Sequence, residues 1–158
     1  MISASLDMLE ESLVKKINIM KKIEEENARQ KEILSADETD LEAFDKTLDK
    51  KGEYIDELDK LDEGFQSLFD RVKTDVGDNK AAYAEQIKRM QVLIHEIMDR
   101  SASIEAEERR NKKMAEAYFS IEREKLSTGK RSAAAAFNYY STMNNFKDIP
   151  PQFYDTKN

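Results

Sequence analysis

The residue types that most often carry out chemistry are scarce in this sequence. His95 is the only histidine, cysteine is absent, and the four glycines lie far apart, at positions 52, 64, 77 and 129. A catalytic histidine needs a nucleophile to activate, a zinc site usually needs further histidine or cysteine ligands, and a phosphate-binding loop needs clustered glycines. We therefore expect no enzyme activity, no metal and no cofactor, and an ordinary half-exposed histidine at position 95.

The acidic and basic residues do not suggest chemistry either. Paired carboxylates such as Glu107 and Glu108 are expected by chance on helix surfaces when 37% of the residues are charged. A two-metal site in a helical bundle would need a Glu-x-x-His motif, but Val92 stands three residues before His95. The basic residues between Arg109 and Lys113 follow glutamates, which is typical of a solvated helix face. With a net charge of −7, we expect no nucleic-acid partner.

The aromatic residues are the better candidates for function. Residues 137–158 contain six of the thirteen Phe and Tyr residues and both prolines. Such side chains gain most from burial and are concentrated at binding sites. A turn or hinge over 127–131 should lead into a short helix over 133–143, and Pro150-Pro151 should keep the end extended. The predicted partner-binding residues are Ala133, Ala136, Phe137, Tyr139, Tyr140, Met143, Phe146, Ile149, Phe153 and Tyr154.

Long helices should precede this aromatic segment. Apolar residues three and four apart predict helices over about residues 5–34, 40–76 and 80–126. Short connections between long helices favour antiparallel neighbours. We therefore predict an all-α fold, an antiparallel three-helix coiled-coil bundle in residues 1–127, followed by a flexible arm, 128–158, that contains the short fourth helix. The residues expected in the core include Phe44, Leu48, Leu58, Phe69, Ile87, Ile94 and Ile97. A dimer in which the third helix pairs across a two-fold axis is the alternative.

Particular residues mark the ends and weak points of the second helix. Thr39 and Glu42 match a capping box at its start, and Gly77 is suited to its end. Two charged residues, Lys51 and Asp62, occupy positions of the apolar seam. Gly64 lies close to Asp62, and mid-helix glycine costs about 1 kcal/mol relative to alanine. This combination leaves room for a bend or local break in the helix.

The sequence contains no sign of a membrane or secretory protein. No run approaches the roughly 20 apolar residues that a transmembrane helix requires. The start, MISASLDMLEESL, lacks a basic region followed by an apolar stretch. We therefore expect no membrane insertion and a cytoplasmic protein.

Two stretches resemble the FlgN family of flagellar type III export chaperones, to which the shorter filament-cap chaperone FliT is related. One is EENARQKEILSADETDLEAFDKTLDKKGEYIDELDKLD, residues 25–62, which is similar to the family's turn between its first two helices. The other is IEAEERRNKKMAEAYF, residues 104–119, which looks like the late third helix of the family. The ending DIPPQFYDTKN departs from the general family pattern.

The resemblance implies a non-enzymatic cytoplasmic chaperone. Such a protein binds hook-filament junction (hook-associated) proteins, keeps them unassembled and delivers them to the flagellar export gate. The substrate-binding helix of the family would correspond to residues 132–143 here. Its partners would be the cargo and the export apparatus, and a homodimer is left open. The alternative is a structural coiled-coil adaptor whose arm packs permanently on its own body.

Overall fold

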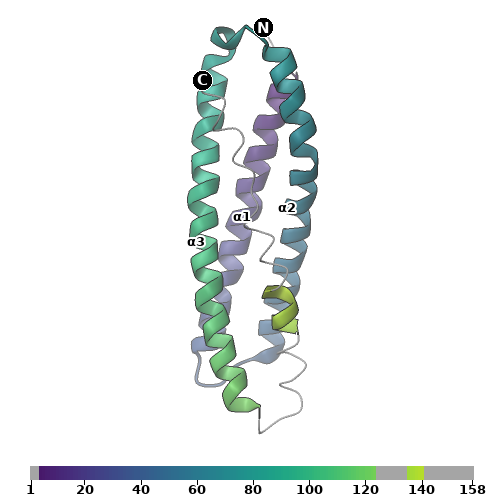
Figure 1. Cartoon of the computed structure of the whole chain (residues 1–158). Coiled ribbons are helices and arrows are strands. Elements are labelled where there is room, and N and C mark those ends of the chain that lie inside the picture. Colours follow the sequence, from purple (N-terminus) through teal and green to yellow (C-terminus); the bar gives the residue numbers. More distant parts are fainter. Residues whose placement is uncertain (1–3, 124–134, 141–158) are drawn as a thin grey trace.

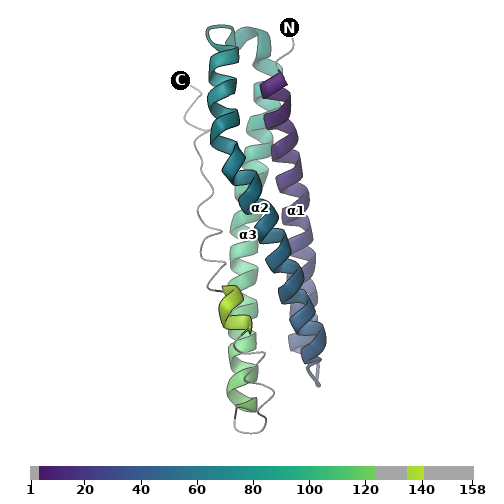
Figure 2. The same cartoon turned by 90° about the vertical axis from the view of Figure 1, so that its right-hand side faces the viewer.

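Three long helices run the length of the molecule in a computed structural model that describes residues 4–123 and 135–140. They are α1 (Ala4–Ser35), α2 (Leu41–Val76) and α3 (Ala84–Glu122). The chain runs down α1, up α2 and down α3, and α1 packs against both of the others (Figures 1 and 2). A short helix over 135–140 follows, and none of the described residues forms a strand. The predicted all-α helical bundle is confirmed.

The ends of α2 are set by short-range hydrogen bonds. Asp40 caps its start, since the side chain accepts a hydrogen bond from the backbone N–H of Ala43 at 3.1 Å. The prediction that Thr39 caps this helix is therefore wrong by one residue, because the Asp40 carboxylate makes the capping contact. Gly77 ends α2 as expected: its φ of +48° suits glycine, and its N–H donates to the Lys73 carbonyl at 3.0 Å.

The second helix continues through its predicted weak point. Asp62 and Gly64 both lie within an unbroken α2. The ammonium of Lys16 on α1 pairs with the Asp62 carboxylate at 2.6 Å, which gives this charged seam residue a partner across the helix interface. No bend has to expose Asp62 to water, because Lys16 satisfies it in place.

The core lies along the seam that the apolar spacing predicts. Phe44, Leu48, Leu58, Phe69, Ile94 and Ile97 are buried, and Ile87 is half-buried. α3 begins later than predicted, because a 3-10 turn (η1, Lys80–Tyr83) precedes it. Within the described residues, no helix is long and apolar enough to cross a membrane.

Candidate protein-binding site

A layer of polar side chains interrupts the apolar core in the half of the bundle that contains the α1–α2 turn. Asn27 and Gln30 come from α1, Thr47 and Lys51 from α2, and Asn111 from α3, and all five are buried. Their hydrogen bonds join the three helices. Gln30 accepts from Lys51 at 2.8 Å and from Asn111 at 3.1 Å, and it donates to the Thr47 hydroxyl at 3.0 Å. Most polar atoms of this layer are hydrogen-bonded, although the buried Oδ1 of Asn27 has no partner among the described residues, and such networks favour one register between helices.

The charged members of this layer form a buried ion pair. The Lys51 ammonium, 0% exposed, lies 2.7 Å from Oε1 of Glu108 on α3. Taking both charges out of water is costly, and the pair offsets that cost only when its polar atoms are well hydrogen-bonded. Glu108 is only partly satisfied, since its buried Oε2 has no hydrogen-bond partner among the described residues.

The third member of this charged group comes from the C-terminal segment. The Tyr139 hydroxyl donates to Oε1 of Glu108 at 2.8 Å, and the Lys51 ammonium lies 4.2 Å from the centre of the Tyr139 ring. An ammonium over an aromatic face is electrostatically favourable, the more so where water is excluded. Tyr139 is only 6% exposed, so it closes the Lys51–Glu108 pair off from solvent.

Burial dominates the acid–base properties of this group. Loss of water around the ammonium lowers the pKa of Lys51 to about 8, although Glu108 beside it acts in the opposite direction. Burial, with Glu108 adding its negative charge, raises the pKa of Tyr139 well above the ordinary tyrosine value. Tyr139 therefore stays a hydrogen-bond donor at neutral pH, and Lys51 stays largely charged.

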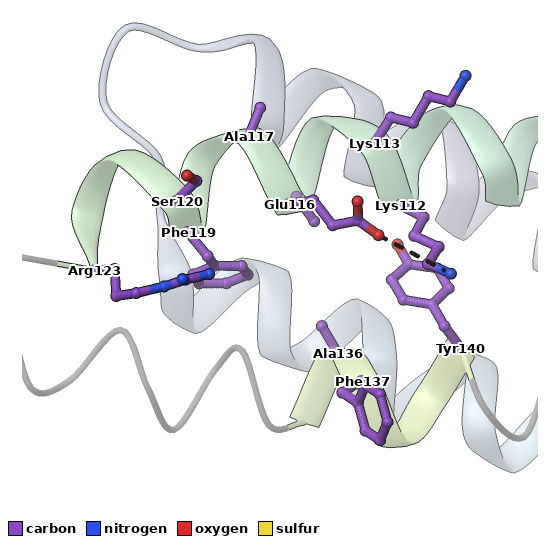
Figure 3. Close-up of a pocket in the computed structure, with 11 residues that line it drawn as sticks. Lys112, Lys113, Glu116, Ala117, Phe119, Ser120, Arg123, Ala136, Phe137 and Tyr140 are labelled. Carbon is purple, nitrogen blue, oxygen red and sulfur yellow. Dashed lines mark ion pairs between the residues drawn. The ribbon is translucent and has the colours of Figure 1, made fainter.

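The 135–140 helix presents two different faces. Ala136 and Tyr139 are buried, whereas the Phe137 ring is 72% exposed. Figure 3 shows the Tyr140 ring pointing towards Lys112 and Glu116 of α3, with the Phe137 ring turned away from α3. A single exposed hydrophobic side chain is common on protein surfaces, so the meaning of Phe137 depends on the pocket beside it.

A pocket of about 830 Å³ lies between this helix and the end of α3 (Figure 3). Its apolar lining comes from both elements. It comprises Ala115, Ala117, Phe119, Ala136, Phe137 and Tyr140. The charged lining comes from α3, with Lys112, Lys113 and Glu116, and from Arg123 just after it; Lys112 and Glu116 form an ion pair at 4.0 Å. Pockets with apolar floors and a few charged groups at the rim are typical binding sites.

The structure places four of the ten predicted partner-binding residues. Ala136, Phe137 and Tyr140 line the pocket, although Ala136 is buried and Phe137 is exposed, while Tyr139 is buried against the bundle. The other six lie outside the described residues. They are Ala133, Met143, Phe146, Ile149, Phe153 and Tyr154.

Lys51 and Glu108 were not predicted as part of any site. The only signal was that Lys51 interrupts an apolar seam, which pointed to a weak position in the helix and not to a buried pair. Glu108 gave no signal, because its acidic neighbours made it look like ordinary helix surface. Predicting this ion pair requires knowing that the Lys51 region of α2 lies close to the Glu108 region of α3.

The other residues considered for chemistry do not converge. His95 is exposed on α3. Within residues 4–123 and 135–140, no three or more His, Asp or Glu side chains are grouped so that they could hold a metal ion. Arg109 pairs with Glu105 at 3.3 Å along the helix surface, as expected for a solvated face.

The chain matches no protein-family model, no curated protein and no solved structure. The resemblance to export chaperones therefore remains a prediction from the sequence.

Proposed function

We propose that this protein is a cytoplasmic export chaperone that binds hook-associated proteins through its C-terminal segment and delivers them to the flagellar type III export gate. The observation that carries the proposal is the 135–140 helix, which is held on the bundle by one face and exposes Phe137 beside an apolar pocket. A cargo chaperone needs such an apolar surface at the bundle's edge, where a partner segment can be held without being buried permanently.

The way the segment is held supports reversible use. Its described contacts with the bundle centre on Ala136, Tyr139 and Tyr140, and two buried oxygens in this region lack hydrogen-bond partners among the described residues, Oε2 of Glu108 and the Tyr140 hydroxyl. A buried polar atom without a partner costs free energy in the docked state, which reduces the net stability of that state. A cargo helix that enters the pocket can therefore rearrange the segment at modest cost.

The pocket lining indicates the kind of cargo segment that fits. Ala115 and Phe119, both buried, form the base of the pocket on α3, and exposed Phe137 lies on its other side. Lys112 and Arg123 stand at the rim. An amphipathic helix whose apolar face enters the pocket, with carboxylates at its edge, would satisfy both features.

Substitution of Phe137 tests the proposal directly. Purified hook-associated proteins from the same organism would be titrated with the full-length protein by isothermal calorimetry. Phe137→Ala should weaken binding about thirtyfold, because large aromatic anchors contribute about 2 kcal/mol or more. Ile121→Ala is the matched control, since Ile121 is similarly exposed (65%) near the end of α3 but does not line the pocket. Equal affinities for wild type and Phe137→Ala, or no binding at all, would contradict the proposal.

A second function is supported by a different observation. Tyr139 is buried and hydrogen-bonded to Glu108, which suits a structural coiled-coil adaptor whose C-terminal segment is a permanent part of the bundle. In that case neither the wild type nor Phe137→Ala would bind hook-associated proteins. Tyr139→Phe would lower the stability of the bundle without any effect on a partner.

A further inference from the structure

A groove between α1 and α2 is separate from the pocket described above. Its lining comes only from these two helices, and its volume is about 360 Å³. Ile19, which is buried, and Leu61, which is half-buried, provide its apolar floor. The floor is continuous with the core, so the groove is a shallow opening onto the α1–α2 seam.

The rim of this groove is basic. Three exposed lysines, Lys15, Lys22 and Lys60, line it, against the single carboxylate of Glu57. Lys60 comes from the acidic stretch 35–77, which contains 6 basic and 14 acidic side chains, whereas Lys15 and Lys22 come from residues 1–34, with 6 basic and 7 acidic. Three lysines against one carboxylate make the rim positive, and electrostatic complementarity uses such local charge to select a partner.

Within residues 4–123 and 135–140, the groove lysines, like other exposed lysines such as Lys21 and Lys88, form none of the ion pairs that join helices. Lys16, Lys51 and Arg89 each pair with a carboxylate on another helix. Lys15 and Lys60 form no ion pair within residues 4–123 and 135–140, and the Lys22 ammonium lies 5.8 Å from the centre of the Tyr54 ring. Their charges are therefore available to an outside partner.

The spacing of these residues suits a helix. Lys15, Ile19 and Lys22 are four and three residues apart and share one face of α1, and Lys60 and Leu61 face them from α2. The two α1 lysines are seven residues apart, about 10.5 Å along the helix axis. A partner helix lying in this groove would meet the two lysines with side chains that are seven residues apart. The partner residues between those two positions would lie on the apolar floor.

We propose that this groove binds an acidic amphipathic helix of a partner protein, with carboxylates seven residues apart on the groove lysines and aliphatic side chains between them on Ile19 and Leu61. The aliphatic floor and the Glu57 carboxylate disfavour a phosphate polymer, which would also be repelled by the acidic body. The proposal does not depend on the proposed chaperone activity.

The probe is an alanine-based helical peptide of about 18 residues, long enough to be helical in isolation, with Glu at positions i and i+7 and Leu at i+3 and i+4. A control peptide has Lys in place of both Glu residues. Fluorescence anisotropy with the full-length protein at low salt should show binding of the Glu peptide at least tenfold tighter than the Lys peptide. Added salt should weaken it, since exposed charges are screened.

Charge reversal in the protein locates the site. Lys15→Glu/Lys60→Glu should weaken binding of the Glu peptide at least tenfold, whereas Lys21→Glu/Lys88→Glu should not. The control pair makes the same change in net charge at exposed lysines outside the groove, and unchanged circular dichroism confirms that both variants fold. Phe137→Ala should also leave this binding unchanged, which separates the groove from the C-terminal pocket.

Three results would overturn the proposal. One is no binding of the Glu peptide up to about 1 mM, an affinity of only about 4 kcal/mol. Another is an equal loss in the two charge-reversal variants. The last is a wild-type dimer in sedimentation that Lys15→Glu/Lys60→Glu converts to monomer, because the groove would then be covered by a second copy of this chain.

Discussion

At the residue scale, the Lys51–Glu108 pair is the most costly feature of the bundle to disturb. Both side chains are buried, and each satisfies the other's charge. Removing one partner of such a pair leaves an uncompensated buried charge, whereas replacing both is often nearly neutral. The pair therefore stabilises the fold only while both charges are present. The changes in unfolding free energy caused by single and double substitutions should be strongly non-additive.

Lys51→Met should lower the free energy of unfolding by about 3–5 kcal/mol, because the Glu108 carboxylate would be left with only the Tyr139 hydroxyl. Lys51→Met/Glu108→Gln should recover at least half of this loss, since an amide oxygen can still accept the hydrogen bond from Tyr139. Urea denaturation at pH 7, followed by circular dichroism, measures both. If the double variant loses as much as the sum of the two single variants, the pair is not coupled as the geometry indicates.

At the element scale, glycine has opposite roles in the interior and at the end of α2. Gly77 has a positive φ at the end of α2, a conformation that residues with a Cβ adopt only with strain. Gly64 lies inside α2, and an added Cβ there would meet no atom within 4 Å. One glycine is needed for the turn into η1, and the other only weakens the helix.

Gly77→Ala should therefore destabilise the protein by about 1–2 kcal/mol, and Gly64→Ala should stabilise it by about 0.5–1 kcal/mol. The same change in side-chain size is made in both, so each variant is the control for the other. Thermal denaturation measures the two shifts in Tm. Shifts of the same sign would show that α2 is not continuous through Gly64 or does not end at Gly77.

At the scale of the whole molecule, the C-terminal segment couples bundle stability to pH. Burial lowers the pKa of Lys51 to about 8 from an ordinary value of 10.5. Between these two values the unfolded chain holds a proton that the folded protein has lost, so folded stability rises with pH. Glu108, Glu107 and Glu26 face the ammonium and oppose this shift, but burial outweighs them. The pKa of the Tyr139 hydroxyl is raised, so the stability that this neutral hydroxyl contributes is lost only near and above pH 10.

Wild-type stability should consequently increase by about 1–2 kcal/mol between pH 8 and 9.5. Deletion of residues 128–158 removes Tyr139, exposes Lys51 to water and should abolish this increase. The deletion itself should cost no more than about 3 kcal/mol at pH 7, since the lost burial of Tyr139 is offset by renewed hydration of the ion pair. Urea denaturation at several pH values tests both statements. A loss above about 5 kcal/mol would make the segment part of the core.

The sequence by itself determined the helices and their buried faces. Apolar residues three and four apart fixed the seams, and Gly77 fixed one turn, because helical periodicity and backbone conformation are local properties of the chain. A short C-terminal helix also followed from the sequence, and the structure describes it over residues 135–140.

Only the tertiary structure decided which polar residues meet. Lys51 and Glu108 are 57 positions apart, and Tyr139 follows Glu108 by 31, so no local pattern could pair them. In the sequence, Lys51 looked like a defect in the apolar seam, Glu108 like a surface acid and Tyr139 like a partner-binding aromatic. Which lysines form ion pairs between helices, as Lys16 and Lys51 do, is decided in the same way. Charge partners are set by the distance between helices in space, whereas periodicity in the sequence reports only which face of a single helix is buried.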